Sequence, residues 1–350
     1  MVGDWWRGRR VLITGHTGFK GSWLSLWLAK HGALLYGLAL APMPGEIYDE
    51  AEVADCLKVD SRGDIRDPRA VEQAFEMAAP EVVFHLAAQP LVRASYEDPT
   101  GTFETNVMGT AHVILASVRS ETVRSVVSVT TDKVYRNVEQ RHGYRESDAL
   151  GGDDPYSASK ACAEIITQSI ARSFGATTGA RIATARAGNV LGGGDVSRDR
   201  LFPDIVRCLV SGAPLQLRYP DSVRPWQHVL DPLAGYIALA QHLVTGRSGP
   251  AYNFGPDAES ELTVAEITDL AFRMWGREPD WSLDASPQPH EAGLLTLDAT
   301  LAMRELAWRP RLDASSTVEW TLEYAREVQA GASPRAVIER QIARYERLQV

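Results

Sequence analysis

The first half of the chain alternates short apolar runs with longer segments of helical character. The apolar runs have the length of buried strands and lie at residues 11–13, 34–40, 82–86, 126–129 and 182–185. The segments with helical signals lie at residues 19–30, 69–78, 99–117 and 155–173. Such alternation predicts an α/β fold with a doubly wound, parallel, Rossmann-type sheet.

Cap signals support three of these helices. Asp67-Pro68 supplies a cap and a first-turn proline, and Asp154 precedes Pro155 in the same way. The helix that begins at Phe19 stops at His31-Gly32, where the glycine suits a helix C-terminus.

The pattern loosens after about Asn189, where glycines and prolines punctuate short elements. Further helices are predicted at residues 233–243, 264–275, 316–327 and 334–348. We therefore expect a dinucleotide-binding domain over 1–189, with 225–250 returning to it, and a smaller, mostly helical substrate-binding domain over 190–350. Ligands of such folds bind at the carboxyl edge of the sheet, which the second domain would close. His290-Glu291 is a candidate lid.

Composition narrows the class of protein. The 350 residues are 45% hydrophobic and 23% charged, and the net charge of −9 argues against nucleic acid as a partner. No apolar run approaches the roughly 18–20 residues of a membrane span, and no signal-peptide core precedes the first strand. The three cysteines lack metal or disulfide spacing. We expect a cytoplasmic protein with reduced thiols, no metal and no membrane partner.

A glycine-rich loop joins the first strand to the first helix. It reads Thr14-Gly15-His16-Thr17-Gly18-Phe19-Lys20-Gly21, a GxxGxxG spacing that lets backbone N–H groups approach a pyrophosphate at the helix N-terminus. Residues 38–45 contain neither the carboxylate that would favour NAD nor an arginine that would favour NADP. Further candidate cofactor contacts are Asp64, Ile65, Leu86, Ala87 and Ala88.

Two clusters carry candidate chemistry. Thr130-Thr131-Asp132-Lys133 follows the predicted strand 126–129, and Tyr156 and Lys160 share one face of the next helix. An ammonium beneath the phenol would favour the phenolate. Thr131, Tyr156 and Lys160 suit proton transfer at a carbinol, whereas Asp132 and Lys133 form a further acid/base pair that alcohol oxidation alone does not need.

These motifs, in this order, resemble the extended short-chain dehydrogenase/reductases, within the NAD-dependent epimerase/dehydratase group. The residues that carry the resemblance are the glycine loop, His85-Leu86-Ala87-Ala88, Asn106, Thr131, Tyr156 and Lys160. Within that group the chain is similar to the CDP-D-glucose 4,6-dehydratases from about residue 10 to about residue 310. The specific signals are Asp132-Lys133 and Arg224-Pro225-Trp226-Gln227-His228. Val196 and residues 140–144 depart from the family pattern, and both lie near the expected sugar site.

The resemblance implies a lyase that recycles NAD. Tyr156 would take the proton of the sugar 4-hydroxyl while hydride leaves C4, with Lys160 and Thr131 in support. Asp132 would protonate the departing 6-hydroxyl and Lys133 would take the C5 proton or stabilise the enolate, and hydride would return to C6 to leave a 4-keto-6-deoxy sugar.

Several residues are candidates for holding the nucleotide sugar. Arg200, Arg218 and Arg224 suit a diphosphate, with surface ion pairs as the alternative. Asn189 and Gln89 are further candidates. Trp226 is either a substrate contact or core, and Asn106 either touches substrate or supports the site.

The resemblance makes CDP-glucose the favoured substrate and implies a role in 6-deoxyhexose and lipopolysaccharide O-antigen biosynthesis. It also implies a homodimer through residues 99–117 and 155–173, or a homotetramer built from it. The alternatives are a nucleotide-sugar 4-epimerase, which has no need of Asp132-Lys133, a dehydratase for a hexose on another nucleotide, and a dinucleotide-sensing regulator.

Overall fold

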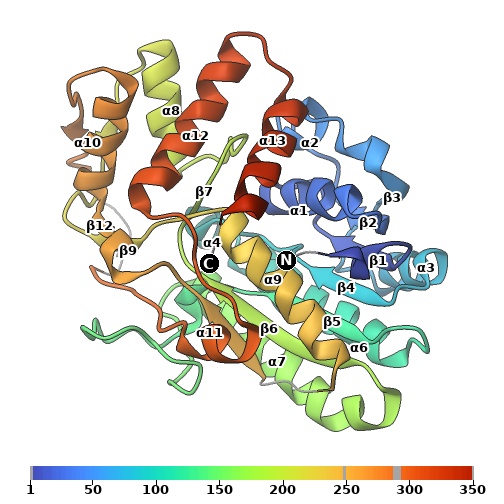
Figure 1. Ribbon diagram of the computed structural model, residues 1–350. Coiled ribbons are helices and arrows are strands. Elements are labelled where there is room, and N and C mark those ends of the chain that lie inside the picture. The colour runs from blue at the N-terminus through green and yellow to red at the C-terminus, as the bar shows by residue number, and fades with distance from the viewer. Residues whose placement is uncertain (1–2, 247–249, 287–292, 349–350) are drawn as a thin grey trace.

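A seven-stranded, wholly parallel sheet forms the centre of the molecule in a computed structural model that describes residues 3–246, 250–286 and 293–348 (Figure 1). His290-Glu291, the candidate lid, lies outside the described residues. The strand order is β3-β2-β1-β4-β5-β6-β11. The strands span β1 Arg10–Thr14, β2 Leu34–Ala39, β3 Leu57–Arg62, β4 Val82–His85, β5 Ser125–Val129, β6 Arg181–Ala187 and β11 Ala251–Phe254.

Alternate residues of the central strands feed two separate cores. On β1, Val11 and Ile13 belong to one hydrophobic cluster, whereas Leu12 belongs to the other. The same division separates Phe84 from Val83 on β4. Both faces are thus buried, as a parallel sheet requires, and β4 and β5 are buried at every position.

Helices cover the two faces in separate layers. On one face lie α3 (Pro68–Ala78), α6 (Thr110–Arg119) and α7 (Pro155–Thr178), with α5 (Pro99–Phe103) and a π-helical turn over Glu104–Gly109 before α6. On the other lie α1 (Phe19–Lys30), α9 (Leu230–Val244) and α13 (Pro334–Arg347). The expected helix over 99–117 is therefore interrupted by the π turn, while α1 has the bounds that its sequence predicts.

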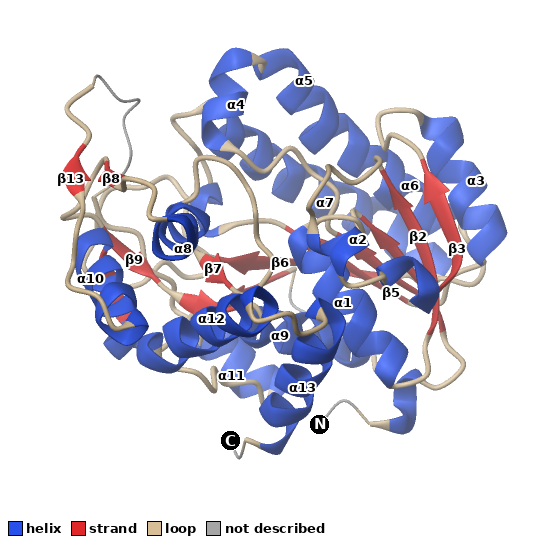
Figure 2. Ribbon diagram, turned by 90° about the horizontal axis from the view of Figure 1, so that it is seen from above, coloured by secondary structure: helices blue, strands red, loops and turns tan. Residues whose placement is uncertain are grey.

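A second group of elements, from the later part of the chain, gathers beside the sheet, at the opposite end of the molecule from β3 (Figure 2). Three helices, α8 (Leu201–Ser211), α10 (Val264–Trp275) and α12 (Ala314–Gln329), share a third hydrophobic cluster. Short strand pairs join them, namely β7 (Val190–Leu191) with β10 (Gln227–His228), β9 (Val223–Pro225) with β12 (Glu261–Thr263), and β8 (Gln216–Leu217) with β13 (Ser282–Leu283). The smaller helices are α2 (Ile47–Glu50), α4 (Val92–Glu97) and α11 (Thr300–Leu306).

Several elements were not expected from the sequence, among them β3, β11 and α8. On the edge strand β3, the more buried positions alternate with exposed ones, so polar residues such as Lys58 and Asp60 hide the strand pattern. Within the described residues, the helices lack the combination of length and apolar character needed to cross a bilayer.

The buried carboxylate of Asp231 ties the C-terminal segments to α9. It accepts hydrogen bonds from the Tyr345 hydroxyl (2.7 Å) and from the backbone N–H groups of Arg311 (2.8 Å) and Leu312 (3.4 Å). Burial nevertheless raises the pKa of this carboxyl to about 7.

We predict that this carboxyl makes stability depend on pH. Its pKa is higher in the folded chain than the value of about 3.9 in an unfolded chain, so the folded state binds the proton more tightly. The contribution of the Asp231 carboxyl to the free energy of unfolding should therefore decline as pH rises from about 4 to about 7 and stay constant above that. Urea unfolding should show the stability difference between wild type and Asp231→Asn shrinking over this range. A difference that grows with pH would contradict the assignment.

Candidate active site

A cavity of about 980 Å³ opens at the carboxyl ends of the parallel strands. Loops after β1, β3, β4, β5 and β6 form its wall on the sheet side, and the α8 region forms the other wall. All predicted catalytic residues and cofactor contacts line it: Gly15, Thr17, Gly18, Phe19, Gly21, Asp64, Ile65, Leu86, Ala87, Ala88, Thr131, Asp132, Lys133, Tyr156 and Lys160. Of the predicted substrate contacts, Asn189, Arg200, Arg218, Arg224 and Trp226 line it too.

The glycine loop is packed too closely for side chains at two positions. Gly15 has φ +76°, and a Cβ there would lie 2.6 Å from the backbone nitrogen of Ala87. A Cβ on Gly21 would lie 2.2 Å from the Gly15 carbonyl oxygen. Helix α1 then begins after Gly18, which offers no side-chain cap to the first N–H groups. These amides are therefore available to an anion in the cavity.

The His16 side chain packs the glycine loop against the second strand, β2. Its fully buried ring makes a 2.7 Å hydrogen bond from Nε2 to Asp60, which also accepts one from the Tyr48 hydroxyl at 2.7 Å. Burial lowers the pKa of His16 despite this partner. The ring occupies the space beside Gly37 on β2, where a Cβ would come within 2.5 Å of it.

Asp64 and Ile65 lie on the same wall with different surroundings. Asp64 is held by Arg66, whose Nε and Nη2 donate to it at 2.8 and 2.6 Å, and this pairing lowers the pKa of the carboxyl. Ile65 is buried against Gly109 in the π turn.

Asp132 is the most unusual group in the cavity wall. It is 2% exposed, and burial raises its pKa, although the neighbouring Lys133 charge and a hydrogen bond from Thr131 (2.9 Å) act in the opposite direction. Its Oδ2 atom has no hydrogen-bond partner among the described residues and faces Gly188, where a Cβ would lie 3.0 Å from it. A carboxyl whose pKa is raised by burial is suited to act as a general acid. Lys133 follows in a short 3₁₀ turn and is only part-buried.

The environment of Tyr156 and Lys160 differs from the sequence expectation. Burial raises the pKa of Tyr156 to about 12, with a Thr131 hydrogen bond and the Arg200 charge opposing it. The Lys160 amine donates to the Val129 carbonyl (3.1 Å), and burial lowers its pKa to about 8. The expected lowering of the phenol pKa by Lys160 is thus wrong for the protein chain by itself, because desolvation is the larger effect.

Gln89 and Asn106, both proposed as substrate contacts, lie off the cavity wall. The Asn106 side chain accepts from the Gln89 backbone N–H (2.8 Å) and donates to the Gln89 carbonyl (3.0 Å) and the Ser159 hydroxyl (2.9 Å). The geometry therefore favours the supporting role for Asn106, which links the loop after β4 to the helix of Tyr156. The Gln89 side chain supports the same loop through its hydrogen bonds to Leu91 and Thr102.

The cationic wall opposite the sheet is held by one carboxylate and by backbone carbonyls. Arg200 lies 3.4 Å from Asp195, and Arg218 donates to the backbone carbonyl of Asp199 at 2.9 Å. Arg224 is buried and donates to the Val223 carbonyl (2.9 Å). Trp226 is 2% exposed and donates to the Leu262 carbonyl (2.8 Å), so it is both core and cavity wall.

Several cations in the wall were missed from the sequence, among them Lys20 and Arg93. Lys20 projects from the glycine loop, and burial followed by the Arg200 charge lowers the pKa of its amine to about 7. Its position between two glycines of the loop was an available signal. Arg93 on α4 is paired with Asp199 at 3.2 Å, and no sequence pattern marks it.

The fold and this cavity define a class. The sequence model of the NAD dependent epimerase/dehydratase family matches residues 11–255, and the chain belongs to that family. The chain is 44% identical over 335 residues to the CDP-glucose 4,6-dehydratase of Salmonella typhimurium, covering 92% of this chain and 93% of that protein.

Two further proteins extend the comparison. A dTDP-glucose 4,6-dehydratase of Streptomyces antibioticus is 31% identical, covering 93% of this chain and 94% of that protein. The crystal structure of a dTDP-glucose 4,6-dehydratase from Streptomyces venezuelae with NAD bound superposes with a TM-score of 0.79 at 27% identity, covering 93% of this chain and 99% of that one.

We predict that the contact between His16 and Gly37 restrains the glycine loop. Gly37→Ala should lower the free energy of unfolding by about 1–3 kcal/mol, because the new methyl group overlaps the imidazole. In a His16→Ala background, the same substitution should cost almost nothing, since the ring is absent. Urea unfolding of the four proteins in this double-mutant cycle measures the coupling. An equal cost in both backgrounds would show that the two residues do not interact.

Proposed function

We propose that the chain is a nucleotide-sugar 4,6-dehydratase that converts CDP-D-glucose to CDP-4-keto-6-deoxy-D-glucose with recycled NAD. The observation that carries this proposal is the buried carboxyl of Asp132, with its raised pKa and Lys133 beside it, in the same cavity wall as Thr131, Tyr156 and Lys160. The 44% identity to a CDP-glucose 4,6-dehydratase supports the same activity and the same nucleotide.

The residues present fit NAD. The tight loop at Gly15 and Gly21 leaves the uncapped N–H groups of α1 facing the cavity, which suits a pyrophosphate. Asp64, Ile65 and residues 86–88 extend this surface along the ends of β3 and β4. When bound, NAD⁺ provides the hydride acceptor and a positive charge that favours the phenolate form of Tyr156.

Oxidation at C4 is assigned to the residues of the β5 end and α7. Tyr156 takes the proton of the sugar 4-hydroxyl as hydride leaves C4, and Thr131 orients the same oxygen. The Lys160 amine donates to the Val129 carbonyl. We assign to it the supply of positive charge that supports proton transfer to Tyr156. The resulting 4-ketone makes the C5 proton acidic enough to be removed.

Elimination is assigned to Asp132 and Lys133. Asp132 donates a proton to the departing 6-hydroxyl, a role that suits a carboxyl whose pKa is raised by burial. Lys133, in its neutral amine form, takes the C5 proton from the adjacent, wetter position. Hydride then returns to C6 and Lys133 returns a solvent-exchanged proton to C5, so no net oxidation occurs. On this assignment, one short segment separates the two steps by residue: Thr131 for oxidation, and Asp132 with Lys133 for loss of water.

The nucleotide diphosphate is assigned to the cationic wall, with Arg200, Arg218 and Arg224 as its partners and Asn189 and Trp226 beside them. Guanidinium groups suit phosphate oxygens because they can donate two parallel hydrogen bonds. Residues 1–189, with α9 and β11 returning, would then serve the dinucleotide, and the rest of residues 190–350 the nucleotide sugar.

Three alternatives remain distinct in what they require. A nucleotide-sugar 4-epimerase needs Thr131, Tyr156 and Lys160 but gives no task to a buried Asp132 with a raised pKa. A dinucleotide-sensing regulator needs none of these groups, and a hexose on another nucleotide would change only the partners of the cationic wall.

We further propose a homodimer in the cytoplasm, formed through α5, the π turn and α7, that serves 6-deoxyhexose synthesis for O-antigens. Support comes from exposed apolar side chains along these helices: Phe103 (38%), Met108 (50%), Ile165 (57%) and Phe174 (47%). Burial of these side chains against a second copy would stabilise association.

We predict that incubation with CDP-glucose and a trace of NAD⁺ gives a product lighter by one water over many turnovers, with no stoichiometric rise of NADH absorbance. Parallel incubations with dTDP-, GDP- and UDP-glucose, analysed by mass spectrometry, test the base. A product of unchanged mass with inverted C4 would mean an epimerase, and stoichiometric NADH would mean a simple dehydrogenase. No turnover with any sugar nucleotide would leave the regulator.

Lys133→Met separates elimination from oxidation, because it keeps the approximate length of the side chain and removes the amine. We expect overall turnover to fall by about 10²–10⁴-fold, the usual worth of general acid–base catalysis. A single turnover should show reduced cofactor and a 4-keto hexose accumulating, with slow exchange of the C5 hydrogen. Elimination at the wild-type rate would show that Lys133 is not the base. The comparison variant Lys58→Met, on the exposed side of β3, should turn over normally.

A further inference from the structure

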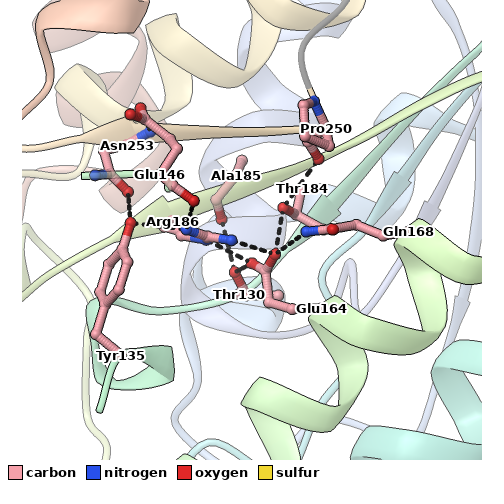
Figure 3. A network of polar contacts seen from close by, with 10 residues as sticks. All are labelled: Thr130, Tyr135, Glu146, Glu164, Gln168, Thr184, Ala185, Arg186, Pro250 and Asn253. Carbon is pink, nitrogen blue, oxygen red and sulfur yellow. Dashed lines mark hydrogen bonds and ion pairs between the residues drawn. The ribbon is translucent and has the colours of Figure 1, made fainter. Parts of the chain in front are cut away.

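A buried ion pair lies beneath the cavity without lining it. Glu164 on α7 and Arg186 on β6 are 0% and 1% exposed, and they share two hydrogen bonds, Nε to Oε1 at 3.0 Å and Nη2 to Oε2 at 2.8 Å (Figure 3). A buried pair of this kind is weak evidence of stabilisation, since well-packed apolar residues often serve as well. Its contacts suggest a more specific role.

The pair is connected to both ends of the catalytic segment Thr131–Asp132–Lys133. Before the segment, the Thr130 hydroxyl donates to Glu164 Oε1 at 2.5 Å. After it, Arg186 Nη1 donates to the Tyr135 hydroxyl at 2.7 Å, and Tyr135 in turn donates to Asn253 at 2.7 Å (Figure 3). Thr130 and Tyr135 therefore bracket the segment and share one buried support.

Lys160 joins the same support from the helix. It lies one turn before Glu164, and its amine holds the carbonyl of Val129, the residue that precedes Thr130. The Glu164 charge raises the pKa of Lys160 and so opposes the lowering that burial causes.

We propose that Glu164, through its pair with Arg186, is a positioning residue that holds the segment Thr131–Asp132–Lys133 at both ends and keeps it in register with Lys160. This inference rests on the proposed function for its kinetic consequence, whereas its structural consequence does not depend on any substrate. A carboxylate is suited to the task because its two oxygens serve Thr130, Thr184 and both donors of Arg186 together.

The chain offers a matched pair of test variants. Thr130 and Thr184 are both buried and both donate to Glu164, Thr184 at 2.7 Å, but only Thr130 adjoins the catalytic segment. Thr130→Val should lower kcat by about 10- to 100-fold, because displaced catalytic groups lose alignment. Thr184→Val should leave kcat within about twofold while costing similar thermal stability. Thr130→Ser, which restores the hydroxyl, should recover most of the activity.

Amide hydrogen exchange provides a readout that is independent of the reaction. In Thr130→Val, peptides spanning residues 131–135 should exchange faster than in wild type, and in Thr184→Val they should not. Equal exchange and equal kcat in the two valine variants would overturn the inference. A wild-type protein that dehydrates no sugar nucleotide would instead overturn the proposed function, and the exchange comparison would still decide the positioning role.

Glu164→Gln tests the electrostatic part. Loss of the charge should lower the pKa of Lys160, so the alkaline limb of the kcat–pH profile should move toward acid by about 1 unit or more. An unmoved limb would refute this part. If the variant fails to fold because Arg186 is left unpaired, the threonine pair decides the question alone.

Discussion

Desolvation at the carboxyl end of β5 is the constraint on which the site depends. β5 is a central strand with helices on both faces, so the residues that follow it emerge from the most buried part of the sheet. The same burial raises the pKa of Asp132 and of Tyr156 and lowers that of Lys160. Each shift favours the neutral form of the group, because burial removes the water that would stabilise its charge.

The surrounding groups adjust this common effect residue by residue. Thr131 bonds to both Asp132 and Tyr156, so one hydroxyl links the acid assigned to elimination with the base assigned to oxidation. Glu164 opposes the effect of burial on Lys160, and its pair with Arg186 keeps its own charge compensated. A single buried layer can thus hold, within one cavity, a carboxyl whose pKa is raised and an amine whose pKa is lowered. We interpret the separation of roles between Asp132 and Lys133 as a consequence of their depth, since one is buried and its neighbour is only part-buried.

Local sequence signals were sufficient for much of the fold and for the cavity wall. The cap residues Asp67 and Asp154 stand where predicted, with side chains that accept from Arg69 and Ser157. The glycine spacing and the helical spacing of Tyr156 and Lys160 could be read from the sequence because each motif is short and its geometry is local. The residues of both motifs line one cavity. The resemblance to the family of CDP-D-glucose dehydratases supplied the order of these motifs along most of the chain.

What the sequence could not provide depends on contacts between distant segments. The strand β3 was hidden by its polar edge, and the partnership of Gln89 with Asn106 is a tertiary contact that no periodicity encodes. The predicted lowering of the Tyr156 pKa was wrong because helical spacing indicates a nearby ammonium but gives no information about desolvation, which raises this pKa. The pairing of Glu164 with Arg186 likewise requires that α7 and β6 be packed together first.

The central claim is that one site moves hydride from C4 to C6 of the same sugar and removes water between the two transfers. The most direct measurement uses CDP-glucose deuterated at C4, followed by analysis of the product by NMR. We predict that the deuterium from C4 appears at C6 of the same sugar molecule, with one hydrogen from solvent at C5. Deuterium that remains at C4, or that is lost to the medium with reduced cofactor, would contradict it.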